Sequence, residues 1–293
     1  MPQNALPYKQ NATIIVLCTG KTTEYNLEVA DWLRIPTLPH SIFTLMGFYE
    51  EIALDYDQMT RFEERMQRET ALFNTWIVRY RFQSAVDVAC GTGLHAILLA
   101  QAGIQTVGAD ISAEMLEQAK QHAEKDAVQI SWIHAGMEQT RQYLEGSYDA
   151  VFCLGNSLPH LLNSKSLHAA FMNFSQLLSP GGIAVIQILN YSRILVEQER
   201  IVGIHRNNSA EYIRFYDFLP EYIRFNLLTV RWEQGKARHS LSSTTLYPYQ
   251  QDELENALHE HQFSEIEWYG NMEFQPFDKS SSPNLVIVAR KMQ

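Results

Sequence analysis

The sequence predicts an α/β fold in which helices cover both faces of a mainly parallel sheet. Two observations lead to this prediction. Between residues 84 and 190, apolar strand-like runs alternate with helical patterns, as in parallel sheets built with right-handed crossovers. After Asn190 the pattern changes to nearly alternating, aromatic-rich segments, which predict antiparallel strands. An antiparallel β cap inserted into an α/β core is therefore expected.

These patterns divide the 293 residues into four segments. They are an N-terminal arm (1–47), a core (48–198), a β cap or lid (199–248), and a C-terminal helix with strands that complete the core sheet (249–293). The arm is too short to fold alone. We therefore expect it to pack on the main body or on another subunit, which would make the protein a homo-oligomer.

Individual elements follow from the periodicity of apolar residues and from turn signals. Strands are expected at 13–18, 84–90, 105–110, 129–134, 148–154, 182–190, 263–269 and 284–289. Helical patterns cover 23–33, 48–80, 93–102, 112–124, 165–178 and 251–261. The last two strands are expected to form a closing antiparallel hairpin, and 179–182 (Ser-Pro-Gly-Gly) is expected to be a turn.

Composition narrows the function class. The formal net charge of -10 disfavours a nucleic-acid backbone or an anionic membrane as the main partner. No apolar run approaches the ~18 residues of a membrane span, and the polar start does not resemble a signal peptide. Three cysteines are too few for a disulfide framework. We predict a cytoplasmic protein that acts on a small molecule.

The glycine turn at Gly91-Thr92-Gly93 is the centre of the predicted binding site. It ends a strand that contains Asp87 and it precedes a helix, so backbone N–H groups and a positive dipole end face one point. Ligands of parallel sheets bind beyond the carboxyl ends of the strands. Asp110 ends the next strand, 19 residues after Gly91, where a carboxylate can accept both hydroxyls of a ribose.

Asp87 helps to choose between two cofactors. Gly91-Thr92-Gly93-Leu94-His95-Ala96 also fits the loose dinucleotide fingerprint, which alone would suggest a nicotinamide-dependent oxidoreductase. An acid four residues before Gly91 would repel a pyrophosphate, but it would attract the ammonium of an amino-acid tail. A ribose-binding acid, a glycine turn and an acid near an ammonium together predict S-adenosylmethionine.

Several motifs resemble those of class I S-adenosylmethionine-dependent methyltransferases, which have a Rossmann-like sheet with an antiparallel last strand. They are Val86-Asp87-Val88-Ala89-Cys90-Gly91-Thr92-Gly93, Asp110, and Tyr148 to Ser157 followed by His160-Leu161. Within this class the chain is most similar to the glycine/sarcosine N-methyltransferases. That likeness continues in Pro180-Gly181-Gly182, Asn190-Tyr191 and Leu246-Tyr247-Pro248, and it covers about residues 48–293.

The resemblance implies a set of cofactor-binding residues. They are Arg65, Asp87, Ala89, Gly91, Gly93, Asp110, Ile111, Met115, Gly136, Met137 and Leu154. By this likeness Asp110 holds the ribose, Met137 packs on the adenine and Arg65 reaches the cofactor carboxylate. Many relatives have an acid for the adenine amino group at the position of Gly136, and this chain lacks it.

Methyl transfer from a sulfonium requires alignment, exclusion of water and removal of a proton, not a metal. No metal-binding motif is present, and no metal is predicted. The candidate catalytic residues are His160 as a proton acceptor, Asn156 near the methyl donor, and Tyr191 in the pocket wall. Glycine-specific relatives have a carboxylate-binding arginine where this chain has Leu189. Arg193, Arg206 or Arg214 of the cap could supply the missing charge.

The sequence therefore predicts a methyltransferase that uses S-adenosylmethionine to methylate a small molecule, most simply an amine. Three alternatives stay open. The acceptor atom could be the oxygen of a small hydroxylated compound, the chain could bind the cofactor without turnover as a regulatory protein, or it could be the oxidoreductase suggested by the loose glycine fingerprint.

Overall fold

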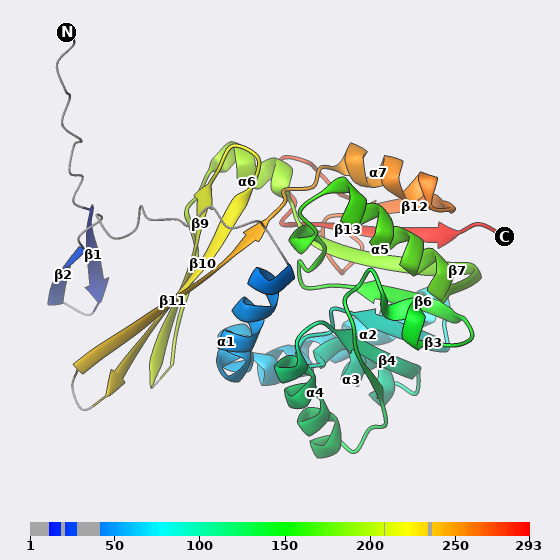
Figure 1. Ribbon diagram of the computed structural model, residues 1–293, viewed down its shortest axis with the longest axis horizontal. Coiled ribbons are helices and arrows are strands. Elements are labelled where there is room, and N and C mark those ends of the chain that lie inside the picture. The colour runs from blue at the N-terminus through cyan, green and yellow to red at the C-terminus, as the bar shows by residue number, and fades with distance from the viewer. Residues whose placement is uncertain (1–11, 19–20, 28–41, 208, 234–235) are drawn as a thin grey trace, which may run out of the picture. The chain divides into compact units, whose positions relative to one another are not determined.

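The computed structural model describes residues 12–18, 21–27, 42–207, 209–233 and 236–293 (Figure 1). Its contacts separate residues 1–41 from residues 42–293. In the first unit, strands β1 (Ala12–Cys18) and β2 (Lys21–Leu27) pair antiparallel. The helix predicted from residue 23 is thus wrong through Leu27, because this threonine-rich segment has β propensity and pairs with β1; residues 28–33 lie outside the described ones.

The second unit contains a seven-stranded sheet with the order β12-β13-β7-β6-β3-β4-β5 (Figure 1). Its strands are β3 (Ser84–Val88), β4 (Gln105–Asp110), β5 (Ser131–His134), β6 (Tyr148–Cys153), β7 (Leu178–Leu189), β12 (Phe263–Tyr269) and β13 (Asn284–Lys291). β3 to β7 pair parallel, and β13 pairs antiparallel with both β7 and β12. The predicted fold class, including the closing antiparallel hairpin, is confirmed.

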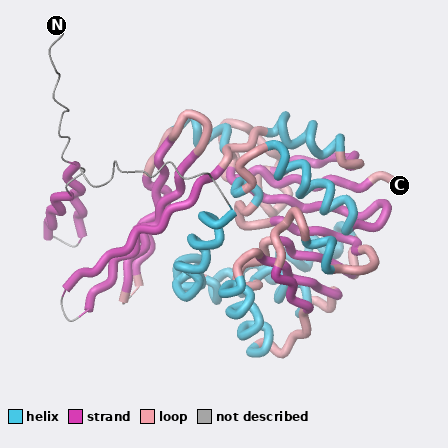
Figure 2. Tube along the Cα trace, in the orientation of Figure 1, coloured by secondary structure: helices cyan, strands magenta, loops and turns pink. Residues whose placement is uncertain are grey.

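Helices cover both faces of this sheet (Figure 2). One apolar core joins α2 (Phe62–Tyr80), α3 (Leu94–Gln101) and the end of α4 (Ala113–Lys125) to the sheet. The other joins α5 (Ser164–Leu177) and α7 (Gln251–Glu260) to the opposite face. The strand order reverses between β3 and β6, so the crevice above this switch point is the expected ligand position.

A second, four-stranded antiparallel sheet follows α6 (Tyr191–Glu197) and has the order β11-β10-β9-β8. Its strands are β8 (Ile201–Arg206), β9 (Ala210–Phe218), β10 (Ile223–Glu233) and β11 (Lys236–Leu246). We call this sheet the cap. Its strands lie within the segment predicted to be an antiparallel insertion.

Helix α1 (Ile42–Thr60) lies between the cap and the core (Figure 1). The Asp57 carboxylate is 3.1 Å from His122 of α4. On the other side, Asp55 accepts a hydrogen bond from the Tyr212 hydroxyl of β9 at 3.1 Å, and Glu51 accepts one from Ser242 of β11 at 2.9 Å. α1 therefore fixes the cap relative to the core.

Two element boundaries differ from the sequence prediction. The helical pattern over 48–80 is two helices, because Arg61 has a left-handed φ of 58° and separates α1 from α2. The predicted turn at 179–182 is built into the start of β7, which begins at Leu178; Gly181 there has a φ of 79°. Among the described residues, no helix has both the length and the apolar character that a membrane span requires.

Candidate functional site

Three residues at the end of β3 and in the glycine turn have a left-handed backbone conformation. Ala89, Gly91 and Gly93 have φ values of 58°, 55° and 86°. A Cβ placed on Gly91 would meet only the Tyr56 ring, 3.8 Å away, whereas one on Gly93 would lie 2.9 Å from both Ala119 and Trp132. Gly91 therefore leaves room for a ligand, while Gly93 is required by the packing of α4 and β5 against the turn.

Asp110 is fastened to this turn. Its Oδ2 accepts a hydrogen bond from the Gly91 amide at 2.7 Å, and its Oδ1 accepts one from the Ser112 amide at 2.9 Å. Each carboxylate oxygen has a second lone pair. The Asp110 side chain is 7 % exposed, so it is largely protected from water but is still accessible to a ligand. The carboxylate can thus hold the turn and still accept two hydroxyls.

Asp87 is a buried carboxyl with an unpaired oxygen. It is 1 % exposed, and its Oδ2 has no hydrogen-bond partner among the described residues. Burial, and secondarily the nearby Asp110 carboxylate, raise the pKa of Asp87 to about 8. A buried carboxyl without a cationic partner is costly in its charged form. A ligand that brings a positive charge beside it would relieve that cost.

This pKa leads to a measurable expectation. The usual pKa of an aspartate is about 3.9, so the folded protein binds more protons at this site than the unfolded chain between about pH 4 and pH 8. The contribution of Asp87 to the free energy of unfolding is therefore lost as pH rises through about 8. A cationic ligand favours the carboxylate, so S-adenosylmethionine should release about one proton on binding at pH 7.

Calorimetric titrations at pH 7 in two buffers with different ionisation enthalpies measure this proton release. The Asp87→Asn variant is the matched control, because it keeps the shape of the side chain and cannot ionise. Equal proton release by the wild type and by Asp87→Asn would contradict the expectation that Asp87 loses its proton when the cationic ligand binds.

Two tyrosines of α1 stand above the turn. The Tyr56 ring lies beside Gly91. Burial raises the pKa of the Tyr49 hydroxyl, and the neighbouring charges that add to this shift include Tyr56, Asp110 and Tyr191. α1 thus covers the turn and reaches both the Asp110 side and the Tyr191 side.

Arg65 of α2 lies near Tyr56. Its guanidinium donates to Glu69 at 2.8 Å and is 3.0 Å from Nε2 of His95. It lines a groove of about 780 Å³ that also reaches Leu154 and Gln187 at the ends of β6 and β7. Arg65 therefore places a cation next to the carboxyl ends of the strands, and its ion pair with Glu69 partly neutralises the charge.

The residues expected around an adenine lie in the turn after β5, after the end of β4 and in α4. Met137 is buried against α5, and Met115 is buried against α1. Gly136 carries no acid, but Oε2 of Glu138 lies 3.0 Å from the position that a Cβ on Gly136 would occupy, and the Ile111 side chain lies 3.7 Å from it. A carboxylate therefore occupies the place of the missing acid.

The Glu138 carboxylate has no ion-pair partner among the residues that the structure describes, and burial raises its pKa. Its backbone is held in place: the Gln139 amide and the Thr140 hydroxyl both donate to the carbonyl of Gly136, at 2.9 and 3.1 Å. The turn that carries Glu138 is thus held in place, with this acceptor at the edge of the site.

The residues predicted for the acceptor side come together at the ends of β6 and β7. Asn156 has a left-handed φ of 65°. Its Nδ2 donates to the Tyr191 hydroxyl at 2.9 Å, and its Oδ1 accepts from the Leu189 amide at 2.9 Å. Tyr191 is buried, which raises the pKa of its hydroxyl well above the usual range. This pair is neutral and polar, and Leu189 adds no charge.

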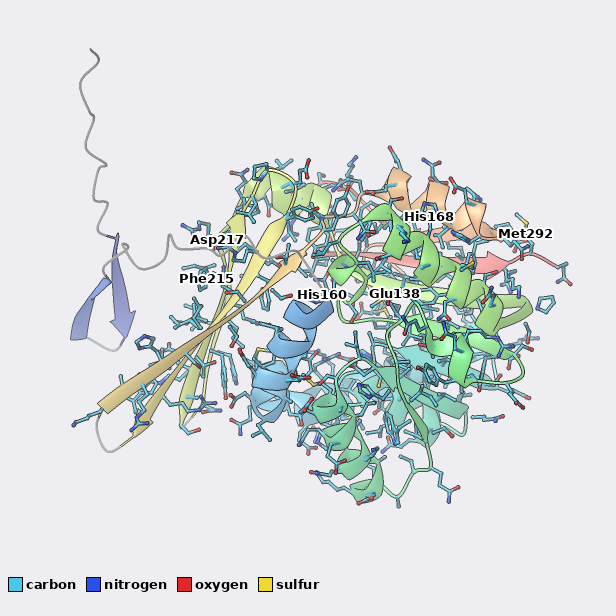
Figure 3. All side chains as sticks on the ribbon, in the orientation of Figure 1. Glu138, His160, His168, Phe215, Asp217 and Met292 are labelled. Carbon is cyan, nitrogen blue, oxygen red and sulfur yellow. The ribbon has the colours of Figure 1, made fainter. Side chains whose placement is uncertain are left out.

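His160 joins three elements. Figure 3 labels this residue. Its Nε2 is 2.9 Å from the Tyr49 hydroxyl of α1, and its Nδ1 is 3.5 Å from the Thr244 hydroxyl of β11. Burial lowers the pKa of His160 to about 4, so the imidazole is neutral at pH 7. A neutral ring has one donor and one acceptor nitrogen. Both nitrogens have protein partners, which favours a positioning role over direct proton transfer.

Three residues of this site were not predicted from the sequence. Tyr49 and Tyr56 are seven residues apart, so they lie on one face of α1, and that spacing was a detectable signal. Glu138 gave no signal, because its position next to Gly136 depends on the fold of the turn. Among the described residues, no group of three or more His, Cys, Asp or Glu side chains could hold a metal ion.

The observed groups fit a nucleoside with a cationic amino-acid tail. Asp110 offers spare lone pairs, Gly91 leaves open space, Asp87 lacks a partner and Glu138 offers an acceptor. No nucleophilic side chain or metal cluster is required for such a ligand to react.

Comparisons with known proteins agree with this geometry. A family model described as a methyltransferase domain matches residues 85–182. The glycine/sarcosine N-methyltransferase of Aphanothece halophytica is 28% identical over 250 residues, which cover 84% of this chain and 88% of that protein.

Two solved structures share the fold. A S-adenosylmethionine-dependent methyltransferase from Clostridium acetobutylicum aligns with a TM-score of 0.71 at 16% identity, over 84% of this chain and 99% of that one. An amino pentose methyltransferase from Micromonospora echinaspora, solved with S-adenosylmethionine bound, aligns with a TM-score of 0.63 at 17% identity, over 81% and 96%. The switch-point glycine turn, the methyltransferase-domain match over residues 85–182 and these relatives together indicate an S-adenosylmethionine-dependent methyltransferase with the class I fold.

Proposed function

We propose that the protein transfers the methyl group of S-adenosylmethionine to the nitrogen of a small amine. The observation that carries this proposal is the neutral cluster of Asn156, Tyr191, Tyr49 and His160 beside the glycine turn. The cofactor supplies a methyl group already activated on a sulfonium. The protein has to present a lone pair in line with that methyl group and to exclude water.

The cofactor side of the proposal uses the residues implied by the resemblance. Asp110 would accept the ribose hydroxyls, Gly91 would pass beneath the ligand, and Arg65 would attract the carboxylate of its tail. The backbones of Ala89 and Leu154 lie at the ends of β3 and β6, at the switch point. Ile111, Met115 and Met137 would enclose the adenine.

On the acceptor side, the Tyr49 hydroxyl can donate to His160 and keep its oxygen free to accept an amine N–H. The Asn156–Tyr191 pair would contact the acceptor from the strand ends. A neutral amine already has a free lone pair. An alcohol or phenol has to lose its proton to become a good nucleophile, and a histidine with a pKa of about 4 is a weak base for that purpose. Nitrogen is therefore favoured over oxygen as the acceptor atom.

Names of the relatives agree with this choice, since they include glycine/sarcosine N-methyltransferases and an amino pentose methyltransferase. The test is transfer of a radiolabelled methyl group from S-adenosylmethionine to a panel of amino acids, amino sugars, simple amines, alcohols and phenols. We expect labelled N-methyl products. Labelled ethers alone would contradict nitrogen as the acceptor atom, and tight cofactor binding with no product from the panel would favour a non-catalytic protein.

A further inference from the structure

The inner face of the cap carries an arginine between two buried tyrosines. Side chains alternate along a strand, so Tyr212, Arg214 and Tyr216 of β9 point to one side. Tyr212 and Tyr216 are only 1 % and 3 % exposed. Tyr212 donates to Asp55 of α1, and the Tyr216 ring packs against Phe225 of β10 at 6.0 Å. Arg214 therefore faces the interior of the protein, and Phe215 and Asp217, labelled in Figure 3, belong to the opposite face.

The space for this guanidinium is provided by the neighbouring strand. Arg214 pairs with Gly203 of β8. A Cβ on Gly203 would lie 2.6 Å from Nη2 of Arg214 and 3.3 Å from its Nε. A larger residue at 203 would displace the guanidinium, so this glycine allows Arg214 to keep its position.

Arg214 lacks the kind of partner that four other arginines in and next to the cap have. Its Nε is buried without a hydrogen-bond partner, and no described acid forms an ion pair with it. Other arginines in and next to the cap have partners: Arg193 has Glu197, Arg200 has Asp217, Arg206 lies over the Trp232 ring and Arg231 has Asp55. A half-buried cation without an anion is costly, and a ligand anion would offset that cost.

The charge of Arg214 affects tyrosines on both the cofactor side and the acceptor side of the site. Burial raises the pKa of the Tyr216 hydroxyl, and Arg214 counteracts this shift; Tyr216 in turn influences Tyr191 of the acceptor cluster. Burial also raises the pKa of Tyr56, which lies beside Gly91, and Arg214 is among the charges that lower it. The guanidinium is thus close to the cofactor turn and to the acceptor cluster.

We propose that Arg214 binds an anionic group of the methyl acceptor, so that the substrate class is an amine that also carries a carboxylate. This inference rests on the proposed function. A guanidinium recognises a carboxylate by two parallel N–H···O bonds. The acceptor nitrogen would lie at the Asn156–Tyr191 pair, and the carboxylate would point toward the cap. The charge that Leu189 cannot provide would then come from β9.

The test uses ligand pairs that differ in the carboxylate: sarcosine with N-methylethanolamine, and 4-aminobutyrate with 4-aminobutanol. Each is titrated by calorimetry into the protein saturated with S-adenosylhomocysteine. We expect at least one acid to bind the wild type ~30-fold more tightly than its neutral partner, and the Arg214→Gln variant to lose this preference. Arg224→Gln is the control, since Arg224 of β10 lies on the opposite face of the same sheet and should keep the preference.

The outcomes separate the two proposals. If the wild type prefers neither acid, or if Arg214→Gln keeps the preference, Arg214 does not bind the acceptor anion. Unchanged affinity of Arg214→Gln for S-adenosylhomocysteine shows that the variant is folded and that the cofactor site is intact. The proposed N-methylation is judged separately by methyl transfer to the amine panel, which can succeed with neutral amines even if Arg214 is not involved.

Discussion

Replacing Asp110 by asparagine is expected to weaken binding of S-adenosylmethionine by roughly 100-fold, the equivalent of about 3 kcal/mol. The carboxylate accepts from the amides of Gly91 and Ser112, and its remaining lone pairs are the proposed acceptors for the ribose hydroxyls. An asparagine amide has one accepting oxygen, so its NH2 group would face an N–H donor of the turn or a ribose hydroxyl.

Calorimetry with S-adenosylmethionine measures this loss. Asp252→Asn, which changes an exposed acid in the first turn of α7, is the matched control and should bind like the wild type. Thermal unfolding of Asp110→Asn should also shift to lower temperature by a few degrees, roughly the effect of losing one charged hydrogen bond. An affinity equal to that of the control would refute the role of Asp110 in ribose binding.

The second large effect is expected at Glu138. We propose that its carboxylate accepts a hydrogen bond from the adenine amino group, because Oε2 occupies the place of the acid that Gly136 lacks. The wild type should then prefer S-adenosylhomocysteine over S-inosylhomocysteine by about 100-fold, since the inosine oxygen would face a carboxylate. In Glu138→Gln, whose amide can either donate or accept, the preference should fall to about 3-fold.

Competition binding of the two nucleosides to the wild type and the variant measures this preference. Glu145→Gln changes an exposed glutamate in the loop before β6 and serves as the control. If Glu138→Gln discriminates as well as the wild type, adenine is recognised by other groups. If the wild type binds neither nucleoside, the cofactor site itself is assigned wrongly.

The sequence alone determined the α/β core. Strand and helix periodicities, the glycine turn and Asp110 are local signals, and each depends on residues within about 25 positions of one another. Parallel strands bring their carboxyl ends to one edge, so Asp87, Gly91 and Asp110 were expected at one point before their contacts were known. The structure places them there, with Asp110 bonded to the Gly91 amide.

Local signals were weaker where tertiary contacts decide the conformation. The break between α1 and α2 falls at Arg61, a residue that is compatible with a helix by propensity, and the left-handed backbone is only visible in the structure. β2 forms because β1 is available to pair with it, although residues 23–33 read as a short helix.

The acceptor side depended on the tertiary structure for a different reason. Asn156, His160 and Tyr191 were singled out from their sequence motifs, but their hydrogen bonds involve Tyr49 of α1 and Thr244 of β11, which are 111 and 84 residues from His160. Those partners showed that both nitrogens of His160 are engaged, which sequence spacing cannot reveal.

The pairing of the arginine charges also depended on the tertiary structure. The sequence shows several arginines in and around the cap, and Arg193, Arg206 and Arg214 were equal candidates to supply the charge that Leu189 lacks. Only the fold separates those with acidic or aromatic partners from Arg214, whose Nε is buried and unpaired. The sequence thus determined the fold class and the cofactor turn, because these depend on local patterns and strand order. The tertiary structure decided which distant side chains meet around the acceptor, because burial and pairing of charges arise only from packing.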